Sequence, residues 1–271
     1  MISIAGSIVL YNNKIETVKK TIHCFLNTNL PIKLYIIDNS TKKEKYIVPE
    51  NERIEYISNE KNAGFGAGHN IAIKRSLNDA KYHLILNPDI SFQSGALEKL
   101  YAFMEANNEV GLVMPKIYYP DGSTQYLCKL IPAPLDLIGR RLNLKILNIL
   151  LRNRFDRYEL RFTDYDKIMD VPYLSGCFMF IRNEVFKKIG FFDENFFIYL
   201  EDIDLSRRIH RYYRTVYNPE VVVYHEHERG SYKNFKLLKY HILSAIKYFN
   251  KWGWFFDKER EMVNKKIIGQ L

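Results

Sequence analysis

The stretch "HLILNPDISF", residues 83–92, decides the fold of this chain. It begins as a short run of apolar residues, typical of a buried strand, and is interrupted by Pro88. Proline cannot donate a hydrogen bond to a sheet and restricts the residue before it, so pairing should stop at Asn87. We therefore expect a buried strand that ends here and holds Asp89 at the edge of a sheet.

Strand and helix patterns alternate on both sides of this stretch. Period-two or continuous apolar runs occupy 3–11, 33–40, 53–58, 82–87 and 110–115, and helical spacing occupies 16–27, 69–80 and 95–108. Such alternation predicts an α/β fold with a mostly parallel sheet flanked by helices. Ligands of these sheets bind at the carboxyl ends of the strands. Asp38 and Asp89 each end a strand, so both are expected at that edge.

The second half of the chain is less regular and contains two basic, apolar helical patterns. Residues 134–155 place leucines and isoleucines in one stripe with arginine and lysine beside it, and residues 233–256 mix lysines with aromatic side chains. A core-facing helix with a solvated basic side and a helix lying on a membrane surface both explain the first pattern. Basic and aromatic residues together favour a lipid headgroup interface for the second.

Composition narrows the function classes without choosing one. The chain has 271 residues, 47% of them hydrophobic, which is enough for a substantial core. A net charge of +9 favours polyanionic partners such as nucleic acid, anionic lipid or phosphorylated substrates. Its three cysteines form no CxxC pair, so neither a disulfide framework nor a zinc site is expected, and a reducing, cytosolic location is favoured. The sequence predicts no signal peptide and no membrane-spanning helix.

A glycine-rich stretch, "NAGFGAGHN" at 62–70, leads into a predicted helix. Gly64, Gly66 and Gly68 permit close approach of the backbone, and a helix start offers free N–H groups to a phosphate. The spacing is GxGxG and the loop does not leave a strand directly, so a dinucleotide fingerprint is a poor fit. A plain flexible turn is the alternative.

The acidic stretch "EDIDL", residues 201–205, follows the aromatic run "GFFDENFFIY". An acidic first helical turn, stabilised by the helix dipole, is the ordinary explanation for such a stretch. Alternatively, Phe196, Phe197 and Tyr199 would form an apolar wall around a carboxylate. Desolvation by that wall would raise its pKa and make it a competent base.

Two histidines end a strand rich in valine, "VVVYHEHERGS" at 221–231. Alternation places His225 and His227 on the same face. A solvated strand edge is the usual setting for such a pair, whereas neutral imidazole is also a common ligand of divalent metals. In the second case, one histidine would share a metal with Asp89.

Taken in chain order, these motifs resemble family 2 glycosyltransferases of the GT-A fold, over about residues 3–250. The resemblance is carried by "IIDNS", the glycine-rich stretch, "NPD" at 87–89, "LSG" at 174–176, "GFFDENFFIYLEDIDLSRR" at 190–208, His225 and Ser231. Within the family the chain looks most like bacterial O-antigen and cell-wall rhamnosyltransferases. The resemblance implies a Rossmann-like sheet and transfer of a sugar, with inversion, from a nucleotide diphosphate sugar.

The resemblance also implies a role for each motif residue. Donor binding is expected at Tyr11, Asp38, Asn62, Gly64, Gly66, Asn70, Asn87 and Asp89. Asp89 and His225 would hold Mn²⁺ or Mg²⁺. Asp202 is the expected general base, and Glu201 would orient sugar hydroxyls. Acceptor binding is expected at Ser175, Gly176 and Glu201. Asn87 stands where the DXD motif has its first acid, which leaves one carboxylate fewer for the metal.

The same resemblance suggests the organisation and partners of the chain. A catalytic domain at 1–230 would comprise a nucleotide-sugar half, 1–115, and an acceptor half, 116–230, followed by a helical extension at 231–271. The first candidate donor is dTDP-L-rhamnose, and the acceptor would be lipid-diphosphate-linked or a saccharide. Peripheral attachment to the inner face of the cell membrane is expected through 134–155 and 233–256, and no nucleic-acid partner is expected. A sugar-phosphate nucleotidyltransferase and a non-catalytic glycan- or polyanion-binding module remain alternatives.

Overall fold

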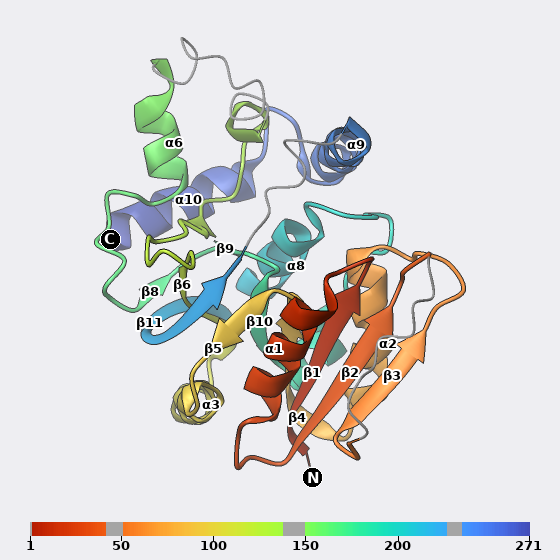
Figure 1. Cartoon of the computed structure of the whole chain (residues 1–271). Coiled ribbons are helices and arrows are strands. Elements are labelled where there is room, and N and C mark those ends of the chain that lie inside the picture. The colour runs from red at the N-terminus through yellow and green to blue at the C-terminus, as the bar shows by residue number, and fades with distance from the viewer. Residues whose placement is uncertain (1, 42–50, 138–149, 227–234) are drawn as a thin grey trace.

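The computed structural model describes residues 2–41, 51–137, 150–226 and 235–271. Within these residues a mixed sheet of nine strands forms the centre of the molecule, and a two-stranded sheet lies beside it (Figure 1). The large sheet consists of β1 (Ile2–Leu10), β2 (Ile32–Asp38), β3 (Ile54–Ser58), β4 (Ala80–Leu86), β5 (Ile90–Phe92), β6 (Val110–Tyr118), β8 (Met169–Asp170), β10 (Phe178–Arg182) and β11 (Arg214–His225). The small sheet pairs β7 (Cys128–Lys129) with β9 (Tyr173–Leu174).

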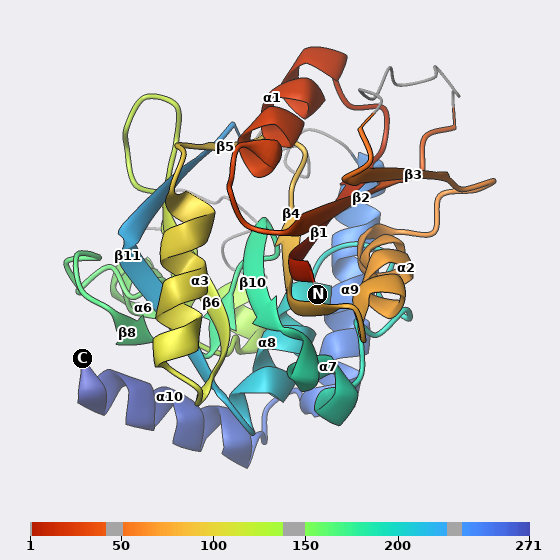
Figure 2. The same ribbon diagram turned by 90° about the horizontal axis from the view of Figure 1, so that it is seen from below.

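Helices cover both faces of the large sheet, as expected of an α/β fold. They are α1 (Ile15–Leu26), α2 (Phe65–Ser76), α3 (Ala96–Ala106), α6 (Arg152–Tyr158), α7 (Asn183–Ile189), α8 (Glu201–His210), α9 (Phe235–Trp252) and α10 (Lys258–Gln270). Seen from below, α1 and α3 lie on one face, and α2, α7 and α8 lie on the other (Figure 2). The expected sheet flanked by helices is confirmed.

The order of strands is β3-β2-β1-β4-β10-β6-β11-β5, with β8 paired to β11. The four strands from the N-terminal part are parallel to one another, whereas β10 runs antiparallel to both β4 and β6. The apolar runs in these strands are continuous because both faces of the strands are buried. In β4, for example, Leu84, Ile85 and Leu86 are fully buried. The carboxyl ends of β1, β2 and β4 therefore meet at one edge of the sheet.

Residues 83–92 follow the prediction up to Pro88 and then differ from it. β4 ends at Leu86, but the chain returns to the sheet as β5, which pairs antiparallel with β11 and sets Ile90 opposite His225. Only three residues, of which Asp89 is one, separate the two strands. Asp89 is thus held between two strands of the sheet.

Two helical predictions need correction at their boundaries. Helix α2 begins at Phe65, inside the glycine-rich stretch, so Gly66 and Gly68 belong to its first turn. At the C-terminus, α9 ends at Trp252 and a second helix, α10, follows, which periodicity did not reveal. Of the predicted helix at 134–155, residues 138–149 lie outside the described residues, as do His227 and Ser231. No helix in the described part of the chain is long and apolar enough to cross a membrane.

The C-terminal helices are fastened to α8 by a buried ion-pair cluster. The Arg207 guanidinium donates to both carboxylate oxygens of Asp257, at 2.7 Å each, and to Glu259 at 2.6 Å. The guanidinium carbon, Cζ, lies 4.1 Å from the centre of the Trp252 ring, and the Arg207 side chain is only 2% exposed. A buried charge requires such pairing, since an unpaired one costs several kcal/mol. This cluster connects α9 and α10 to the helix that carries Glu201 and Asp202.

Candidate active site

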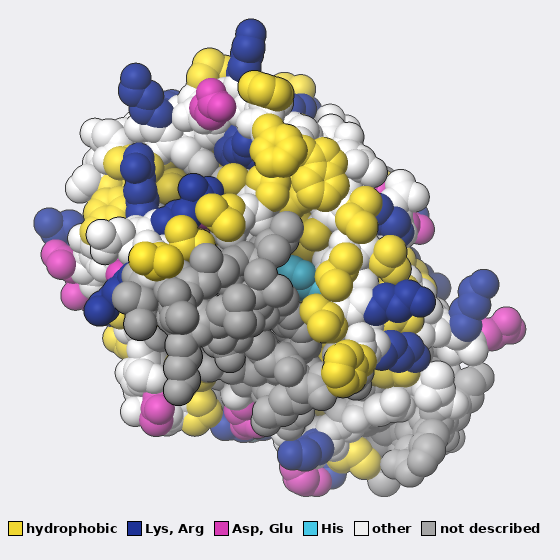
Figure 3. Space-filling view, turned by 90° about the horizontal axis from the view of Figure 1, so that it is seen from above, with side chains coloured by type: hydrophobic (Ala, Val, Ile, Leu, Met, Phe, Trp, Pro, Cys, Tyr) yellow, Lys and Arg dark blue, Asp and Glu magenta, His cyan; other side chains and the backbone are white. Residues whose placement is uncertain are grey.

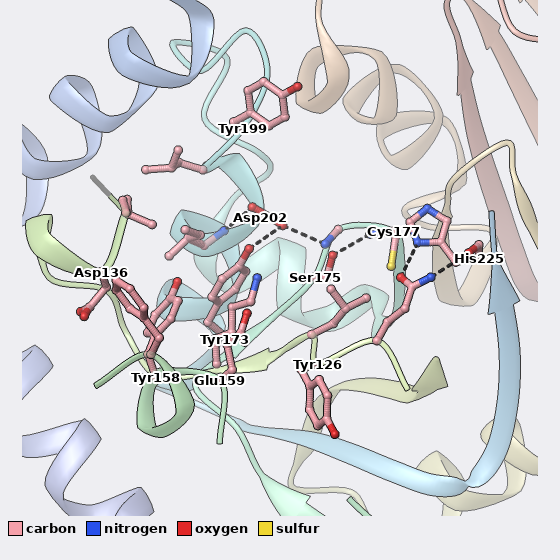
Figure 4. A pocket seen from close by; sticks show the side chains of 18 of the residues that line it. Tyr126, Asp136, Tyr158, Glu159, Tyr173, Ser175, Cys177, Tyr199, Asp202 and His225 are labelled. Carbon is pink, nitrogen blue, oxygen red and sulfur yellow. Dashed lines mark hydrogen bonds between the residues drawn. The ribbon is translucent and has the colours of Figure 1, made fainter. Parts of the chain in front are cut away.

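A cavity of about 1050 Å³ opens beside the carboxyl ends of the central strands (Figure 4). It brings together residues that are far apart in the sequence. Several of the predicted site residues line it: Asn87, Ser175, Gly176, Glu201, Asp202 and His225. Its other walls come from the β7–β9 sheet, α6 and α9, and include Lys129, Tyr173, Tyr158 and His241. A cavity of this size accommodates a small-molecule ligand.

Asp89 and His225 lie next to one another at this end of the sheet. Asp89 Oδ1 is 3.3 Å from His225 Nε2, and Glu226 N–H donates to the Asp89 carbonyl at 3.2 Å. The β5–β11 register produces this contact because it aligns Ile90 with His225. Asn87 also contacts the imidazole, with its Nδ2 3.3 Å from Nε2. The two predicted metal ligands, Asp89 and His225, and the predicted donor-binding residue Asn87 therefore lie together, with Asp89 and Asn87 both next to Nε2 of the imidazole.

The other imidazole nitrogen of His225 contacts Gln125. His225 Nδ1 lies 3.0 Å from Gln125 Oε1, and Gln125 Nε2 donates to the His225 carbonyl at 2.7 Å. An Nδ1–H that donates to this amide oxygen leaves Nε2 as the nitrogen that faces Asp89, and this nitrogen has to give up its proton before it can bind a cation. Burial lowers the pKa of His225, but Cys177 and Asp89 outweigh burial and raise this pKa to about 10.

These residues fit a divalent cation as a partial set of ligands. A carboxylate and an imidazole directed at one point are suitable for Mn²⁺ or Mg²⁺. Among the described residues, no group of three or more His, Cys, Asp or Glu side chains is arranged to hold a metal. From the described residues, Asp89 and His225 would supply two ligands to such a cation, and a bound diphosphate would supply oxygens for the remaining positions.

Helix α8 begins in an unusual backbone conformation. Tyr199 and Leu200 have φ angles of +71° and +67°, the left-handed region that side chains other than glycine seldom adopt. Leu200 is buried among Tyr173, Phe196 and Ile203, and this packing holds the strained turn. The turn places the first two residues of the helix, Glu201 and Asp202, at the cavity wall.

Asp202 is held by three hydrogen bonds. Its Oδ2 accepts from the Gly176 N–H at 2.9 Å and from the Tyr173 hydroxyl at 3.3 Å, and its Oδ1 accepts from the Ile203 N–H at 2.9 Å. Burial raises the pKa of Asp202, while the Gly176 N–H, the charge of Lys129 and the other two donors lower it. The carboxylate is thus fixed in position, and the opposing influences on its pKa leave it able to exchange a proton.

Glu201 is buried and incompletely partnered. The residue is 4% exposed, and its Oε2 accepts no hydrogen bond from any described residue. Burial and, next, the charge of Asp202 raise the pKa of Glu201 well above its ordinary range. A buried carboxyl oxygen without a partner costs free energy unless a ligand supplies a donor, and a sugar hydroxyl is such a donor.

Asp38 and Tyr11 lie at the ends of neighbouring strands but do not line the cavity. Leu10 pairs with Asp38 in the β1–β2 register, which brings Tyr11 close to Asp38 at the sheet edge. The Asp38 carboxylate accepts from the Tyr56 hydroxyl at 2.5 Å and from the Ser40 N–H at 2.8 Å, and the residue is 2% exposed. Tyr11 is exposed. Their expected contact with the nucleoside stays a prediction.

The glycine-rich stretch serves packing. A Cβ atom on Gly64, whose φ is +96°, would lie 2.3 Å from the Phe197 carbonyl oxygen, and one on Gly66 would lie 2.9 Å from Phe192. Asn62 accepts from the Gly64 N–H at 2.9 Å. Asn70 is buried and exchanges two hydrogen bonds of 3.0 Å with the Phe192 backbone. These contacts fasten α2 to the segment before α8; donor binding by these residues stays a prediction.

Sequence reasoning missed several residues of the site. Asp204 is fully buried and accepts from Trp252 Nε1 at 2.9 Å, from Lys251 at 2.7 Å and from Arg208 at 2.8 Å, so it anchors α9. Tyr173, Lys129 and Gln125 belong to no motif. Tyr173 directly precedes "LSG", and Lys129 and Gln125 lie in the irregular second half, while the short β7–β9 pairing that aligns Lys129 with Tyr173 has no periodicity.

Comparisons with known proteins agree with the fold and the motifs. Residues 7–190 match the family described as Glycosyl transferase family 2. The chain is 26% identical over 218 residues to the low-salt glycan biosynthesis hexosyltransferase Agl10 of Haloferax volcanii, covering 76% of this chain and 61% of that protein. It is 24% identical over 212 residues to the N-acetylglucosaminyl-diphospho-decaprenol L-rhamnosyltransferase of Mycobacterium tuberculosis, covering 74% and 68%.

Two solved structures share the fold. One is the crystal structure of GalNAc-T7 with UDP, GalNAc and Mn²⁺, with a TM-score of 0.61, 18% identity, and coverage of 83% of this chain and 43% of that one. The other is S. aureus TarS 1-349, with a TM-score of 0.58, 14% identity, and coverage of 98% and 71%. Both confirm the predicted GT-A architecture. Since the family match covers more than half of the sequence, the chain belongs to glycosyl transferase family 2.

Proposed function

We propose that this chain is an inverting glycosyltransferase that moves a hexosyl or deoxyhexosyl group from a nucleoside diphosphate sugar to an acceptor hydroxyl. The observation that carries the proposal is the placement of Asp202, a half-buried carboxylate fixed by hydrogen bonds, in the same cavity as Asn87 and His225. Such a reaction needs two chemical tasks: removal of the proton from the acceptor hydroxyl and stabilisation of the leaving diphosphate. The two sides of this cavity are chemically suited to those two tasks.

In the proposed reaction Asp202 accepts the proton of the acceptor hydroxyl. The acceptor oxygen then bonds to the anomeric carbon as the bond from that carbon to the diphosphate oxygen breaks, and the electron pair leaves with the diphosphate. Attack from the face opposite the leaving group inverts the anomeric configuration. Glu201, with its unpartnered Oε2, would orient a hydroxyl of the sugar. A divalent cation held by Asp89 and His225 would neutralise charge on the leaving diphosphate.

The first candidate donor is dTDP-L-rhamnose, and the first candidate acceptor is a lipid-linked diphosphate saccharide. Support comes from the mycobacterial relative, whose name specifies L-rhamnose and a diphospho-decaprenol acceptor, at 24% identity. The archaeal relative is named a hexosyltransferase, so other hexose donors belong in the same test. Release of nucleoside diphosphate from a panel of dTDP-, UDP- and GDP-sugars, with Mn²⁺ and with chelator, distinguishes the donors. Release from no sugar under either condition would contradict the proposal.

We also propose that α9 lies against an anionic membrane surface. Phe235, Ile242, Leu243 and Ile246 are exposed along α9 and form its apolar stripe. The view from above shows hydrophobic side chains in a row with Lys or Arg side chains beside them (Figure 3). Lys236, Lys239 and Lys247 lie on the same helix, and each cation near an anionic leaflet contributes about 1 kcal/mol. His241 of α9 lines the cavity, so this surface adjoins its wall.

Flotation with phosphatidylglycerol vesicles tests the attachment. Wild-type protein should float with these vesicles at low salt and less at high salt, and Ile242→Asp should remain at the bottom of the gradient. The control is Met262→Asp on α10, an apolar residue outside the stripe that is more exposed than Ile242, 66% against 49%. Equal flotation of both variants, or none by the wild-type protein, would contradict membrane attachment through α9.

A further inference from the structure

Asp202 has neighbours on the small β7–β9 sheet that the proposed reaction does not yet use. Lys129 and Tyr173 are directly paired across these two strands, and both line the cavity. Lys129 Nζ lies 5.4 Å from the centre of the Tyr173 ring, and the Tyr173 hydroxyl donates to Asp202. The cation, the phenol and the carboxylate therefore form one connected group on the cavity wall.

Burial disfavours the ionised form of a carboxylate unless a nearby cation or hydrogen-bond donor compensates for it. Tyr173 is buried and Asp202 is half-buried, and in the described part of the chain the charge of Lys129 acts on the Asp202 carboxylate. The next residue, Glu201, is a second carboxyl, and burial and the charge of Asp202 raise its pKa. On Asp202 itself, the charge of Lys129 and the hydroxyl of Tyr173 act against the effect of burial, because both favour the ionised carboxylate.

We propose that Lys129 and Tyr173 are positioning residues that hold Asp202 in its ionised form, ready to accept the proton of the acceptor. The inference rests on the proposed function, since it gives these two side chains a purpose only if Asp202 is the base. The cation acts from the β7 strand and the hydroxyl from the β9 strand. Neither has to touch the reacting atoms.

Other titratable groups near Asp202 also contribute to the pH dependence of activity. They are Glu201 on the same helix, Tyr158 of α6 beyond Tyr173, and His241 of α9 on the cavity wall. Each is unchanged in a variant of Lys129 or Tyr173. A displaced pH profile in such a variant therefore reports on the lost cation or hydroxyl.

The experiment measures kcat/KM against pH for Lys129→Met, Lys129→Arg and Tyr173→Phe, with the exposed Lys99→Met on α3 as control. Removing the cation should move the acidic limb upward by roughly one pH unit or more, while activity on the alkaline plateau changes little. Tyr173→Phe should move the limb in the same direction. Lys129→Arg, which keeps the charge, and Lys99→Met should leave it at the wild-type position.

Two outcomes would overturn the inference. One is an equal loss of activity by Lys129→Met at every pH with the limb unmoved, and the other is a limb that Lys129→Arg displaces as far as Lys129→Met. The carboxyl titration of Asp202, followed by carbon NMR in wild type and Lys129→Met, gives the same answer without any turnover. If Asp202→Asn turns over normally, the proposed function fails; if Asp202→Asn is inactive and the limb is unmoved, only this inference fails.

Discussion

Asp89 Oδ1 lies 3.3 Å from His225 Nε2 because a three-residue strand, β5, pairs with the end of β11 and aligns Ile90 with His225. Pro88 interrupts the sheet between β4 and β5, so Asp89 is neither buried in a strand nor free in a loop. The contact thus follows from a proline that stops one strand and a short strand that restores pairing immediately afterwards.

Loss of the imidazole should weaken metal-dependent binding of the diphosphate. His225→Gln keeps a polar side chain but removes the nitrogen that faces Asp89, and we expect Mn²⁺-dependent affinity for a nucleoside diphosphate to fall by about tenfold or more. Isothermal titration with and without Mn²⁺ measures the effect. His23→Gln, at an exposed position on α1, is the control. Unchanged Mn²⁺ dependence in His225→Gln would remove this residue from the metal site.

The buried carboxyl of Glu201 should make the protein less stable as pH rises. Its folded pKa lies above the ordinary value of 4.5, because burial and the charge of Asp202 disfavour the ionised form. The neutral group is therefore fully tolerated below about pH 4.5, and stability is lost as pH rises through the folded pKa. Glu201→Gln should accordingly be more stable than wild type at pH 8 and equal to it near pH 4.

Urea unfolding at the two pH values measures this difference. A stability gap between Glu201→Gln and wild type that is the same at pH 4 and pH 8 would show that the Glu201 carboxyl does not titrate differently on folding. Glu16→Gln, on the exposed side of α1, provides the control for a carboxyl without burial.

Breaking the buried cluster at Arg207 should destabilise the whole fold. Arg207→Met leaves Asp257 buried without the two hydrogen bonds from the guanidinium, and removing one partner of such a pair costs about 3 to 5 kcal/mol. Arg75→Met removes an ion pair to Glu55 in which both side chains are more than 40% exposed, and should cost less than about 1 kcal/mol. Thermal or urea unfolding compares the two. Similar small losses in both would mean that the cluster does not secure α9 and α10.

Comparing alanine variants of two glycines distinguishes the cost of backbone strain from the cost of a packing clash at Gly64. Gly64 and Gly190 share an extended backbone conformation with positive φ, +96° and +78°, but a Cβ at Gly64 would lie 2.3 Å from the Phe197 carbonyl oxygen, whereas one at Gly190 would meet open space. Both alanine variants bear the cost of this glycine-favoured conformation, about 1 to 3 kcal/mol. Gly64→Ala should lose clearly more, because the segment before α8 has to move. Equal losses in unfolding free energy would show that the segment before α8 moves away from the added Cβ at little cost.

The sequence predicted the parts of this molecule that depend on local pattern. The alternating strands, the interruption at Pro88 and the acidic start of α8 could be read from periodicity and backbone chemistry. The roles of Glu201, Asp202, Asp89 and His225 came from the order of motifs along the chain. The contact between Asp89 and His225 depends on the β5–β11 register, which no local pattern specifies.

Other features could not be read because they depend on contacts distant in sequence. In the sequence, Asp204 and Asp202 are both acids in the first turn of one helix. In the structure, Asp204 is fully buried and contacts three donors, two of them on α9. The glycines suggested a phosphate loop, whereas Phe192 and Phe197 pack against Gly66 and Gly64. Lys129 and Tyr173 meet through strands of only two residues, too short to give a periodic signal.

The proposed roles converge on the carboxylate that Gly176 and Tyr173 hold in the cavity wall. Asp202→Asn preserves the shape of this side chain and removes its ability to accept a proton, whereas Asp164→Asn changes an exposed residue outside the cavity lining. The most direct measurement is the release of nucleoside diphosphate by the two variants, together with donor binding by calorimetry. We predict that Asp202→Asn loses a factor of about 10² to 10⁴ in kcat and still binds the donor, while Asp164→Asn matches wild type. Wild-type turnover by Asp202→Asn would contradict the account.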